Sequence, residues 1–156
     1  MDSTHTATVR WQLGADDFLK RRYGRAHTWT FDGGAVVPAS SSPHVVPLPM
    51  SDAAAVDPEE AYVAALSSCH MLWFLDFASR AGWVVESYED EAEGRMGRDA
   101  QGREIVERVV LRPRTRFQAG RAPDAATLGA LHHEAHAACF LANSVRTAIT
   151  CEPGFA

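Results

Sequence analysis

The sequence lacks the features that mark several large classes of protein. It has no low-complexity segment, no excess of basic residues and only three cysteines among 156 residues. The formal net charge is −5, and acidic and basic residues are mixed along the chain, so no electrostatic footprint for DNA, RNA or anionic lipid is present. We therefore expect no nucleic-acid partner.

Two further absences bear on where the protein works. Residues 1–9 are polar and lack the charged-then-apolar order of a signal peptide, and no run of about 18 apolar residues is found that would span a bilayer. An odd number of cysteines without an export signal argues against a secreted disulfide framework and leaves metal binding, redox chemistry or plain burial open. These features predict a cytoplasmic protein with no membrane partner.

The residues that are present indicate an ordinary folded protein. The chain is 46% hydrophobic and 22% charged, and its length suits a single domain over residues 1–156. Periodicity and turn signals predict strands, helices and loops in a definite order. The predicted elements are strands at 6–12 and 27–31, a turn at 32–34, a loop at 38–49, a helix at 57–82, a hairpin of strands 83–96 and 104–117, a helix at 124–140 and a strand at 145–151.

A long helix is predicted at the centre of the fold. Asp57 suits the N-cap, Pro58 suits the first helical position, and Glu60 completes a capping box, while Gly82 is expected to end the helix. Its apolar side chains are spread around the axis, which is typical of a helix buried on every side. Because a second chain could cover one face of so long a helix, we expect a homodimer. The predicted fold class is α+β, with antiparallel sheets around this buried helix.

The positions of the cysteines narrow the chemistry. Cys69 lies near the middle of the long helix, where a lone cysteine is usually a small core residue. Cys139 lies 70 positions later and shares the inward face of the second helix with Leu131 and Ala135. Two helices packed in one core could bring these thiols within disulfide range. Cys151 follows the last strand, and we interpret it as structural.

A nucleophilic thiol at Cys69 requires a nearby positive charge. The nucleophile is the thiolate, and an apolar helix interior favours the neutral thiol. His70 is adjacent in sequence but points about 100° away around the helix axis. The basic turn at residues 20–25 is therefore the best source of the cation.

Two motifs resemble the OsmC/Ohr family, which comprises osmotically inducible protein C and the organic hydroperoxide resistance proteins. The first is Asp57-Pro58-Glu59-Glu60 with Cys69 ten residues after Glu59, and the second is His136-Ala137-Ala138-Cys139. Residues 25–34 look most like the OsmC-like branch. One departure is Phe140, which stands directly after Cys139 where many relatives carry proline.

The resemblance implies an intertwined homodimer that reduces organic hydroperoxides, and sometimes hydrogen peroxide, without a metal or other cofactor. Cys69 corresponds to the peroxidatic position and Cys139 to the resolving one. Glu59 corresponds to the glutamate of a family ion pair, whose arginine is either Arg25 or Arg22. A thiol reductant, such as a dithiol or lipoyl-type donor, would restore the oxidised enzyme.

Helix geometry adds a constraint on this arrangement. Ten residues of helix separate Glu59 from Cys69 by about 15 Å, at a rise of about 1.5 Å per residue. Glu59 is therefore too distant to contact Cys69 of its own helix. Our hypothesis is that Glu59 and its arginine serve Cys69 of a second chain in the dimer.

Two other functions without peroxidase turnover stay open. His132, His136 and Cys139 are spaced to place three metal ligands on one helix face, although residues 132–136 do not form the His-Glu-x-x-His pattern of zinc proteases. The alternative to a metal site is that His132 and His133 are solvated and that His136 caps the helix or packs near the thiol. Alternatively, aromatic residues could line a pocket for an apolar ligand; these are Trp29, Phe31, Trp73 and Phe74.

Overall fold

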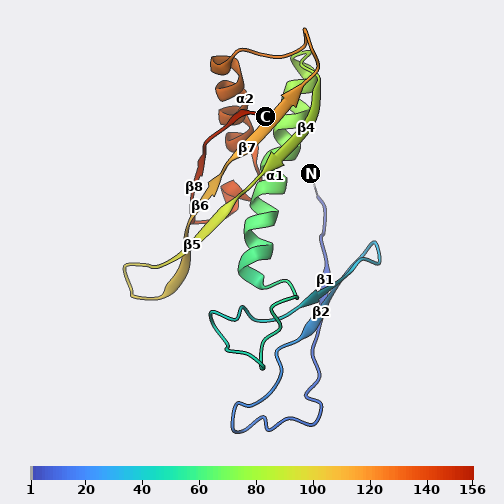
Figure 1. Ribbon diagram of the computed structural model, residues 1–156, viewed down its shortest axis with the longest axis vertical. Helices are drawn as coiled ribbons and strands as arrows, with labels where there is room; N and C mark the ends of the chain where they lie inside the picture. The colour runs from blue at the N-terminus through green and yellow to red at the C-terminus, as the bar shows by residue number, and fades with distance from the viewer. Residues whose placement is uncertain (1) are drawn as a thin grey trace. The chain divides into compact units, whose positions relative to one another are not determined.

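The protein has an α+β fold, seen in a computed structural model that describes residues 2–156 (Figure 1). The chain divides into two compact units, of which the first ends at Ala61 and the second covers Tyr62–Ala156. Each unit is described by itself below. The single domain over residues 1–156 stays a prediction.

The first unit contains a three-stranded antiparallel sheet in the order β1-β2-β3. Its strands are β1 (Ala7–Arg10), β2 (His27–Phe31) and β3 (Val36–Ala39). The first two strands confirm the prediction, but β3 lies partly in the predicted loop. Proline at position 38 obscured this strand in the sequence, and the structure tolerates it because β3 is an edge strand.

The long helix α1 (Pro58–Arg80) begins and ends close to its predicted limits. The backbone N–H of Glu60 donates to Asp57 Oδ1 at 2.7 Å, and the N–H of Asp57 donates to Glu60 Oε2 at 3.2 Å, so the capping box is formed. Gly82 follows with φ of +82°, a left-handed conformation that glycine adopts without strain.

Burial on every side of α1 was predicted with a second chain covering one face, and the single chain buries only one side of the helix. The buried residues form one stripe at four-residue spacing, Leu66, His70, Phe74 and Ala78. Leu72, on another face, is 61% exposed. The second unit covers only one side of the helix, because its sheets and second helix all pack against this stripe.

The sequence prediction that no segment could span a bilayer was too strict. By length and composition alone α1 could cross a membrane, since its most apolar 18-residue window has a mean hydropathy of 1.2. The same composition suits the core helix of a soluble protein. In the single chain 22% of this window is buried, along the one stripe that contacts the sheets of the second unit.

The second unit contains two three-stranded sheets, in the orders β4-β7-β9 and β5-β6-β8. Each long strand of the predicted hairpin is broken once, which gives β4 (Val85–Asp90), β5 (Glu93–Arg98), β6 (Glu104–Leu111) and β7 (Pro113–Phe117). The hairpin is confirmed by the antiparallel pairs β4–β7 and β5–β6. The last strands, β8 (Ala148–Cys151) and the unpredicted β9 (Gly154–Phe155), pair in parallel with β6 and β7, so these sheets are mixed rather than antiparallel.

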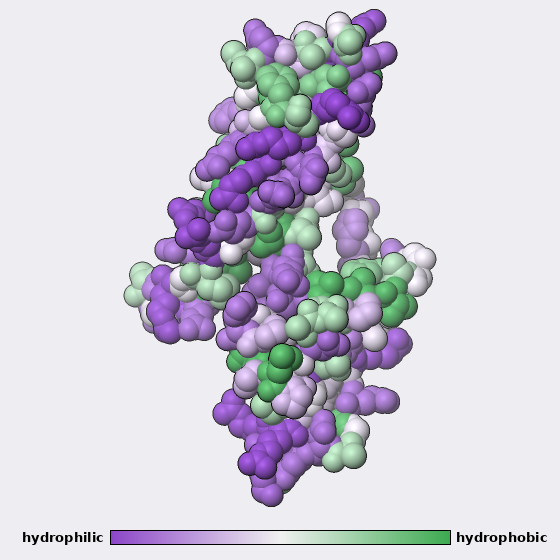
Figure 2. All heavy atoms as spheres, in the orientation of Figure 1, coloured by the Kyte–Doolittle hydropathy of each residue, from purple (hydrophilic) through white to green (hydrophobic). Residues whose placement is uncertain are grey.

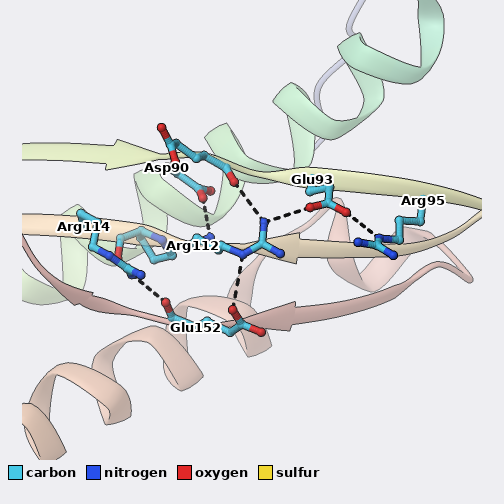
Figure 3. Close-up of polar contacts among 8 residues, drawn as sticks. Asp90, Glu93, Arg95, Arg112, Arg114 and Glu152 are labelled. Carbon is cyan, nitrogen blue, oxygen red and sulfur yellow. Dashed lines mark hydrogen bonds and ion pairs between the residues drawn. The ribbon is translucent and has the colours of Figure 1, made fainter.

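A group of charged residues lies where the long strands break (Figure 3). The backbone N–H of Arg112 donates to Asp90 Oδ1 at 2.6 Å, and the Arg112 guanidinium pairs with Glu93 and Glu152, each at 3.4 Å. Arg114 donates to the backbone carbonyl of Glu152 at 2.9 Å. Exposed ion pairs contribute only about 0–1 kcal/mol each, so the ion pairs of this group add little to stability.

The second helix, α2 (Ala125–Ala138), packs against α1. Its N-cap Asp124 accepts a hydrogen bond from the backbone N–H of Thr127 at 2.7 Å. One buried cluster joins both helices to β4 and β7, and a second joins α1 to β6 and β8. The buried members are Phe74, Ala78, Leu128, Leu131 and Ala135 in the first cluster and Leu66, Val109 and Leu111 in the second.

Candidate active site

Two free thiols are positioned by the packing of the two helices. Cys69 lies midway along α1 and is half-buried, whereas Cys139 is the C-cap of α2 and is 1% exposed. At this helix end the backbone N–H of Cys139 donates to the carbonyl of His136 at 3.2 Å. The Cys139 Sγ accepts a hydrogen bond from the backbone N–H of Ala142 at 3.4 Å. The backbone of the α2 terminus therefore fixes the direction of this thiol.

The structure brings Cys69 and Cys139 together. Burial raises the pKa of the Cys139 thiol to about 11, and the neighbouring Cys69 side chain adds to the rise. One turn after Cys69 on α1, Trp73 packs edge-on against Phe140, the residue after Cys139, with ring centroids 5.3 Å apart. Phe140, which replaces the proline of many relatives, thus joins the end of α2 to α1.

The environments of the two thiols give them different chemistry. Cys139 is shielded from solvent and, with its raised pKa, stays protonated at neutral pH, so it is a poor first nucleophile. Cys69 is the more accessible of the two. The arrangement suits a first attack by Cys69 and a second step in which Cys139 reacts with the oxidised Cys69.

Arg25 and Glu59 line one cavity of the first unit. The cavity is open, has a volume of about 530 Å³ and has a largely aromatic and polar lining: Val9, Trp11, Phe18, Tyr23, Arg25, His27, Ser40, Ser41, Pro58 and Glu59. Arg22 is exposed and does not line it; its backbone N–H donates to the carbonyl of Asp17 at 3.0 Å. Of the two predicted arginines, Arg25 is the one that shares a cavity with Glu59.

The Arg25 guanidinium is held by its own turn. It stacks over the Tyr23 ring, 3.6 Å from the ring centroid, and donates to the backbone carbonyls of Arg21, at 3.4 Å, and of Tyr23. Within residues 2–156, Arg25 and Glu59 are not within ion-pair distance of each other. The ion pair implied by the family resemblance is therefore not formed in this structure, although both of its members are at the same cavity.

Aromatic side chains that the sequence analysis did not assign to the site form the wall of this cavity. Phe18 and Tyr23 stack with ring centroids 4.7 Å apart, and Trp11 lies 5.6 Å from Tyr23. Trp11 Nε1 also donates to the carbonyl of Gly24 at 2.8 Å, which ties β1's end to the arginine turn. These rings give the arginine an apolar, partly shielded surrounding.

Comparison with known proteins identifies the family. Residues 51–153 match the OsmC-like protein family. The chain belongs to this family. An OsmC-like protein of unknown function from Vibrio cholerae is 50% identical, with a TM-score of 0.95 over 97% of this chain and 99% of that chain. None of the curated proteins is similar to the chain.

Two organic hydroperoxide resistance proteins share the fold of this OsmC-like chain at low identity. The protein from Elizabethkingia anophelis is 16% identical, with a TM-score of 0.72 over 100% of this chain and 97% of that chain. OhrB of Bacillus subtilis is 19% identical, with a TM-score of 0.64 over 99% of this chain and 98% of that chain. The fold is therefore that of the OsmC/Ohr proteins.

A second polar cluster of the OsmC-like chain lies inside the second unit. His70 of α1 and His132 of α2 are 1% and 2% exposed, and His70 Nε2 lies 2.9 Å from His132 Nδ1. Cys151 Sγ of β8 lies 3.7 Å from the first of these nitrogens and 3.8 Å from the second. Cys151, interpreted from the sequence as structural, thus contacts two buried histidines.

The side chains that could hold a metal ion differ from the set that the sequence analysis considered. Among residues 2–156, His70, His132 and Cys151 are the group of three whose ligand atoms lie within 4.8 Å of one another. The predicted set of His132, His136 and Cys139 is not brought together, because His132 turns inward toward His70 of α1. The alternative interpretation of His132 as solvated is wrong, since this side chain is 2% exposed. Helical spacing could have located the new pair, since His70 is four residues from both Leu66 and Phe74 in the buried stripe.

Both imidazoles are neutral at physiological pH. Burial lowers the pKa of His70 from 6.5 to about 4 and that of His132 from 6.5 to about 3. The unfolded chain therefore binds protons below pH 6.5 that the folded chain does not take up until the pH reaches about 4. Because the unfolded state binds more protons in this window, the free energy of unfolding contributed by the pair falls as the pH falls from 6.5 toward 4.

We expect this acid sensitivity to disappear when the pair cannot titrate. His70→Gln and His132→Asn place amide groups near Nε2 and Nδ1, so the double variant keeps polar atoms there without a titratable ring. Urea midpoints measured with a chelator between pH 7 and pH 4 should fall more steeply for the wild type than for the double variant. Parallel curves for the two proteins would mean that the histidines do not contribute to acid denaturation.

Proposed function

We propose that this OsmC-like protein is a cytoplasmic, thiol-dependent peroxidase that reduces organic hydroperoxides. The main support is the meeting of Cys69 and Cys139, which lie 70 positions apart in the sequence and on different helices. An accessible thiol beside a shielded, protonated one is the pair that a two-cysteine peroxidase needs. The fold shared with organic hydroperoxide resistance proteins agrees with this function.

The proposed reaction has three steps. The Cys69 thiolate attacks the terminal oxygen of ROOH; the O–O bond breaks, Cys69 becomes a sulfenic acid, and the departing RO⁻ takes a proton to leave as the alcohol. The Cys139 thiol then displaces water from the sulfenic acid and forms the Cys69–Cys139 disulfide. An external dithiol reduces that disulfide by thiol–disulfide exchange and is itself oxidised.

An apolar substrate suits the surroundings of the thiols. Leu72, one turn after Cys69, is 61% exposed, and Phe140, next to Cys139, is 58% exposed. In the first unit Trp11 and Phe18 are 40% and 48% exposed beside Arg25. Figure 2 shows apolar side chains at the surface of both units. Such surfaces favour an alkyl hydroperoxide, or a second copy of the chain, over a small polar peroxide.

The positive charge that favours the thiolate is assigned to Arg25 of a partner subunit. Glu59 starts α1, about 15 Å along the helix from Cys69 of the same chain at about 1.5 Å per residue. In an intertwined homodimer, the cavity that holds Arg25 and Glu59 would instead face the partner subunit's Cys69. The exposed face of α1, including Leu72, would then be covered by the partner.

Mixed dimers test this assignment. We expect a dimer of one Cys69→Ser chain and one Glu59→Ala chain to keep one intact site, and hence about half of the wild-type activity. A dimer that carries both substitutions in one chain and none in the other should have no intact site. Differently tagged chains would allow each mixed dimer to be purified and assayed. The reverse ranking of the two dimers would show that Glu59 serves Cys69 of its own chain.

Loss of Arg25 should slow the enzyme in a pH-dependent way. We expect Arg25→Ala to slow oxidation of Cys69 by at least about tenfold at pH 7, because the cation no longer favours the thiolate. The loss should be smaller at high pH, since alkali forms the thiolate without help. Stopped-flow measurement of Cys69 oxidation against pH checks this result.

Arg22→Ala is the matched control for Arg25→Ala. Arg22 lies in the same turn but is exposed and does not line the cavity with Glu59. Its replacement should leave the rate and its pH profile unchanged. A shifted profile in Arg22→Ala alone would transfer the role to that residue, and unchanged profiles in both variants would place the cation elsewhere.

A further inference from the structure

The buried cluster of His70, His132 and Cys151 has no part in the proposed thiol chemistry. Its three side chains come from three different elements, α1, α2 and β8, and their ligand atoms lie within 4.8 Å of one another. We propose that these three residues bind a single zinc(II) ion. The site would be additional to the Cys69–Cys139 pair, because it uses neither of those thiols.

The distances between the three atoms suit one shared metal ion. Tetrahedral zinc, with bonds of about 2.0 Å to nitrogen and about 2.3 Å to sulfur, separates two nitrogens by about 3.3 Å and a nitrogen from a sulfur by about 3.5 Å. The observed nitrogen–sulfur separations are 3.7 and 3.8 Å, and the two nitrogens are 2.9 Å apart. The two imidazole nitrogens need to move apart by only about 0.4 Å to admit the ion.

A larger hydrogen-bond network does not account for the two histidines. Buried imidazoles are ordinarily explained either by such a network or by a ligand. Across residues 2–156, the outer nitrogens, His70 Nδ1 and His132 Nε2, have no hydrogen-bond partner, and neither does the hydroxyl of nearby Tyr88. The two rings instead turn their remaining nitrogens toward each other and toward Cys151. Without a ligand these two nitrogens share one hydrogen bond, and a metal ion bound between them and Cys151 would use the lone pairs of both.

One carboxylate near the cluster, that of Asp90, favours a cation there. Burial is the largest cause of the lowered pKa of His70 and of the raised pKa of Cys151. His136 adds to the lowering of the His70 pKa, whereas Asp90 opposes that lowering and adds to the rise of the Cys151 pKa. Both effects mean that this carboxylate favours positive charge at the position of the three ligand atoms. Asp90 is fixed there by hydrogen bonds from the backbone N–H of Arg112, at 2.6 Å, and from the Ser67 hydroxyl, at 2.5 Å.

Zinc binding at this cluster has a simple proton balance. Both histidines are neutral at pH 7 and supply lone pairs without losing a proton. Burial raises the pKa of Cys151 to about 12, so its thiol is protonated until the metal displaces the proton. One zinc–sulfur bond forms and one proton is released for each ion bound. Three protein ligands leave a fourth position for a water molecule.

The test uses full-length protein in which Cys151 is the sole thiol. The Cys69→Ser/Cys139→Ser double variant removes the peroxidase thiols, so the result does not depend on the proposed function. Metal-stripped protein is titrated with cobalt(II), a spectroscopic probe for zinc sites, and then with zinc. We expect one cobalt per chain, thiolate-to-cobalt charge-transfer absorption, displacement by one equivalent of zinc and a rise in Tm with either metal.

Ligand variants in the same background assign the site. Cys151→Ser should remove the charge-transfer absorption, and His70→Gln or His132→Asn should each weaken zinc binding by at least about 100-fold, since loss of an outer-shell partner alone costs about 10–100-fold. His133→Gln is the matched control, because His133 is adjacent to His132 but exposed, and it should bind as the parent does. Absence of charge-transfer absorption in the parent, or equal zinc affinity in the ligand variants, would overturn the proposal.

Alkylation provides a measurement that needs no ligand substitution. In unfolding amounts of denaturant without metal, Cys151 should react fully with iodoacetamide. Under native conditions zinc should slow alkylation of Cys151 at least about tenfold, because the bound thiolate is neither free nor exposed. Peptide mass analysis identifies the modified cysteine. An alkylation rate of Cys151 that zinc does not change would count against the site even if a variant fails to fold.

Discussion

Cys69→Ser is expected to reduce peroxide consumption to the uncatalysed background. A serine hydroxyl is not deprotonated at neutral pH, so the variant has no anionic nucleophile at the position where the accessible thiol stood. Cys139 cannot take over, because its thiol is 1% exposed and its pKa is raised to about 11. The measurement is the loss of an organic hydroperoxide over many turnovers with a dithiol as the final reductant.

Ser68→Ala is the matched control for this variant. Ser68 is the neighbour of Cys69 on α1, it is exposed, and alanine favours the helix. This variant should consume peroxide at the wild-type rate, which separates loss of the thiol from disturbance of the helix. Turnover by Cys69→Ser at a rate near that of the wild type would remove Cys69 from the reaction.

Cys139→Ser is expected to permit one oxidation and then to stop. Cys69 should reach the sulfenic acid in a single turnover, because its reaction with peroxide does not use Cys139. Without the second thiol no intramolecular disulfide can form, so excess peroxide should convert Cys69 to the sulfinic and sulfonic acids. Intact-mass analysis should show the stepwise addition of one, two and three oxygen atoms, whereas the wild type should lose two hydrogens.

The rate of the first oxidation serves as the control for Cys139→Ser. It should stay close to that of the wild type in a single-turnover experiment, since only the resolving step is removed. Repeated turnover by this variant in the absence of a small added thiol would show that another group resolves Cys69. In that case the protonated, buried thiol of Cys139 would have a structural role only.

Local signals allowed the helices and most of the strands to be predicted. The capping box at Asp57 and Glu60 and the N-cap at Asp124 are formed by neighbouring residues, so their geometry follows from local sequence. The strand β3 was missed because Pro38 is typical of a loop unless a neighbouring strand is known. The strand breaks and the parallel pairing of β8 depend on contacts distant in sequence, which periodicity does not report.

In the candidate site, too, features set by neighbouring residues could be predicted, whereas contacts between distant elements could not. The inward direction of Cys139 could be predicted from helical spacing, and its contact with Cys69 followed once two helices shared a core. The meeting of His70, His132 and Cys151 requires three elements to converge, so Cys151 was interpreted as structural. The roles of Cys69, Cys139, Glu59 and Arg25 stay predictions, since geometry places these residues but does not show turnover.

Peptide mapping after a single oxidation tests the central claim most directly. Reduced wild-type protein is treated with one equivalent of an organic hydroperoxide, blocked with iodoacetamide and digested without reductant. We expect a disulfide-linked pair of peptides that contain Cys69 and Cys139, one molecule of alcohol formed per chain, and Cys151 recovered as the alkylated thiol. A disulfide that contains Cys151, or unoxidised Cys69 after the peroxide is consumed, would contradict the account.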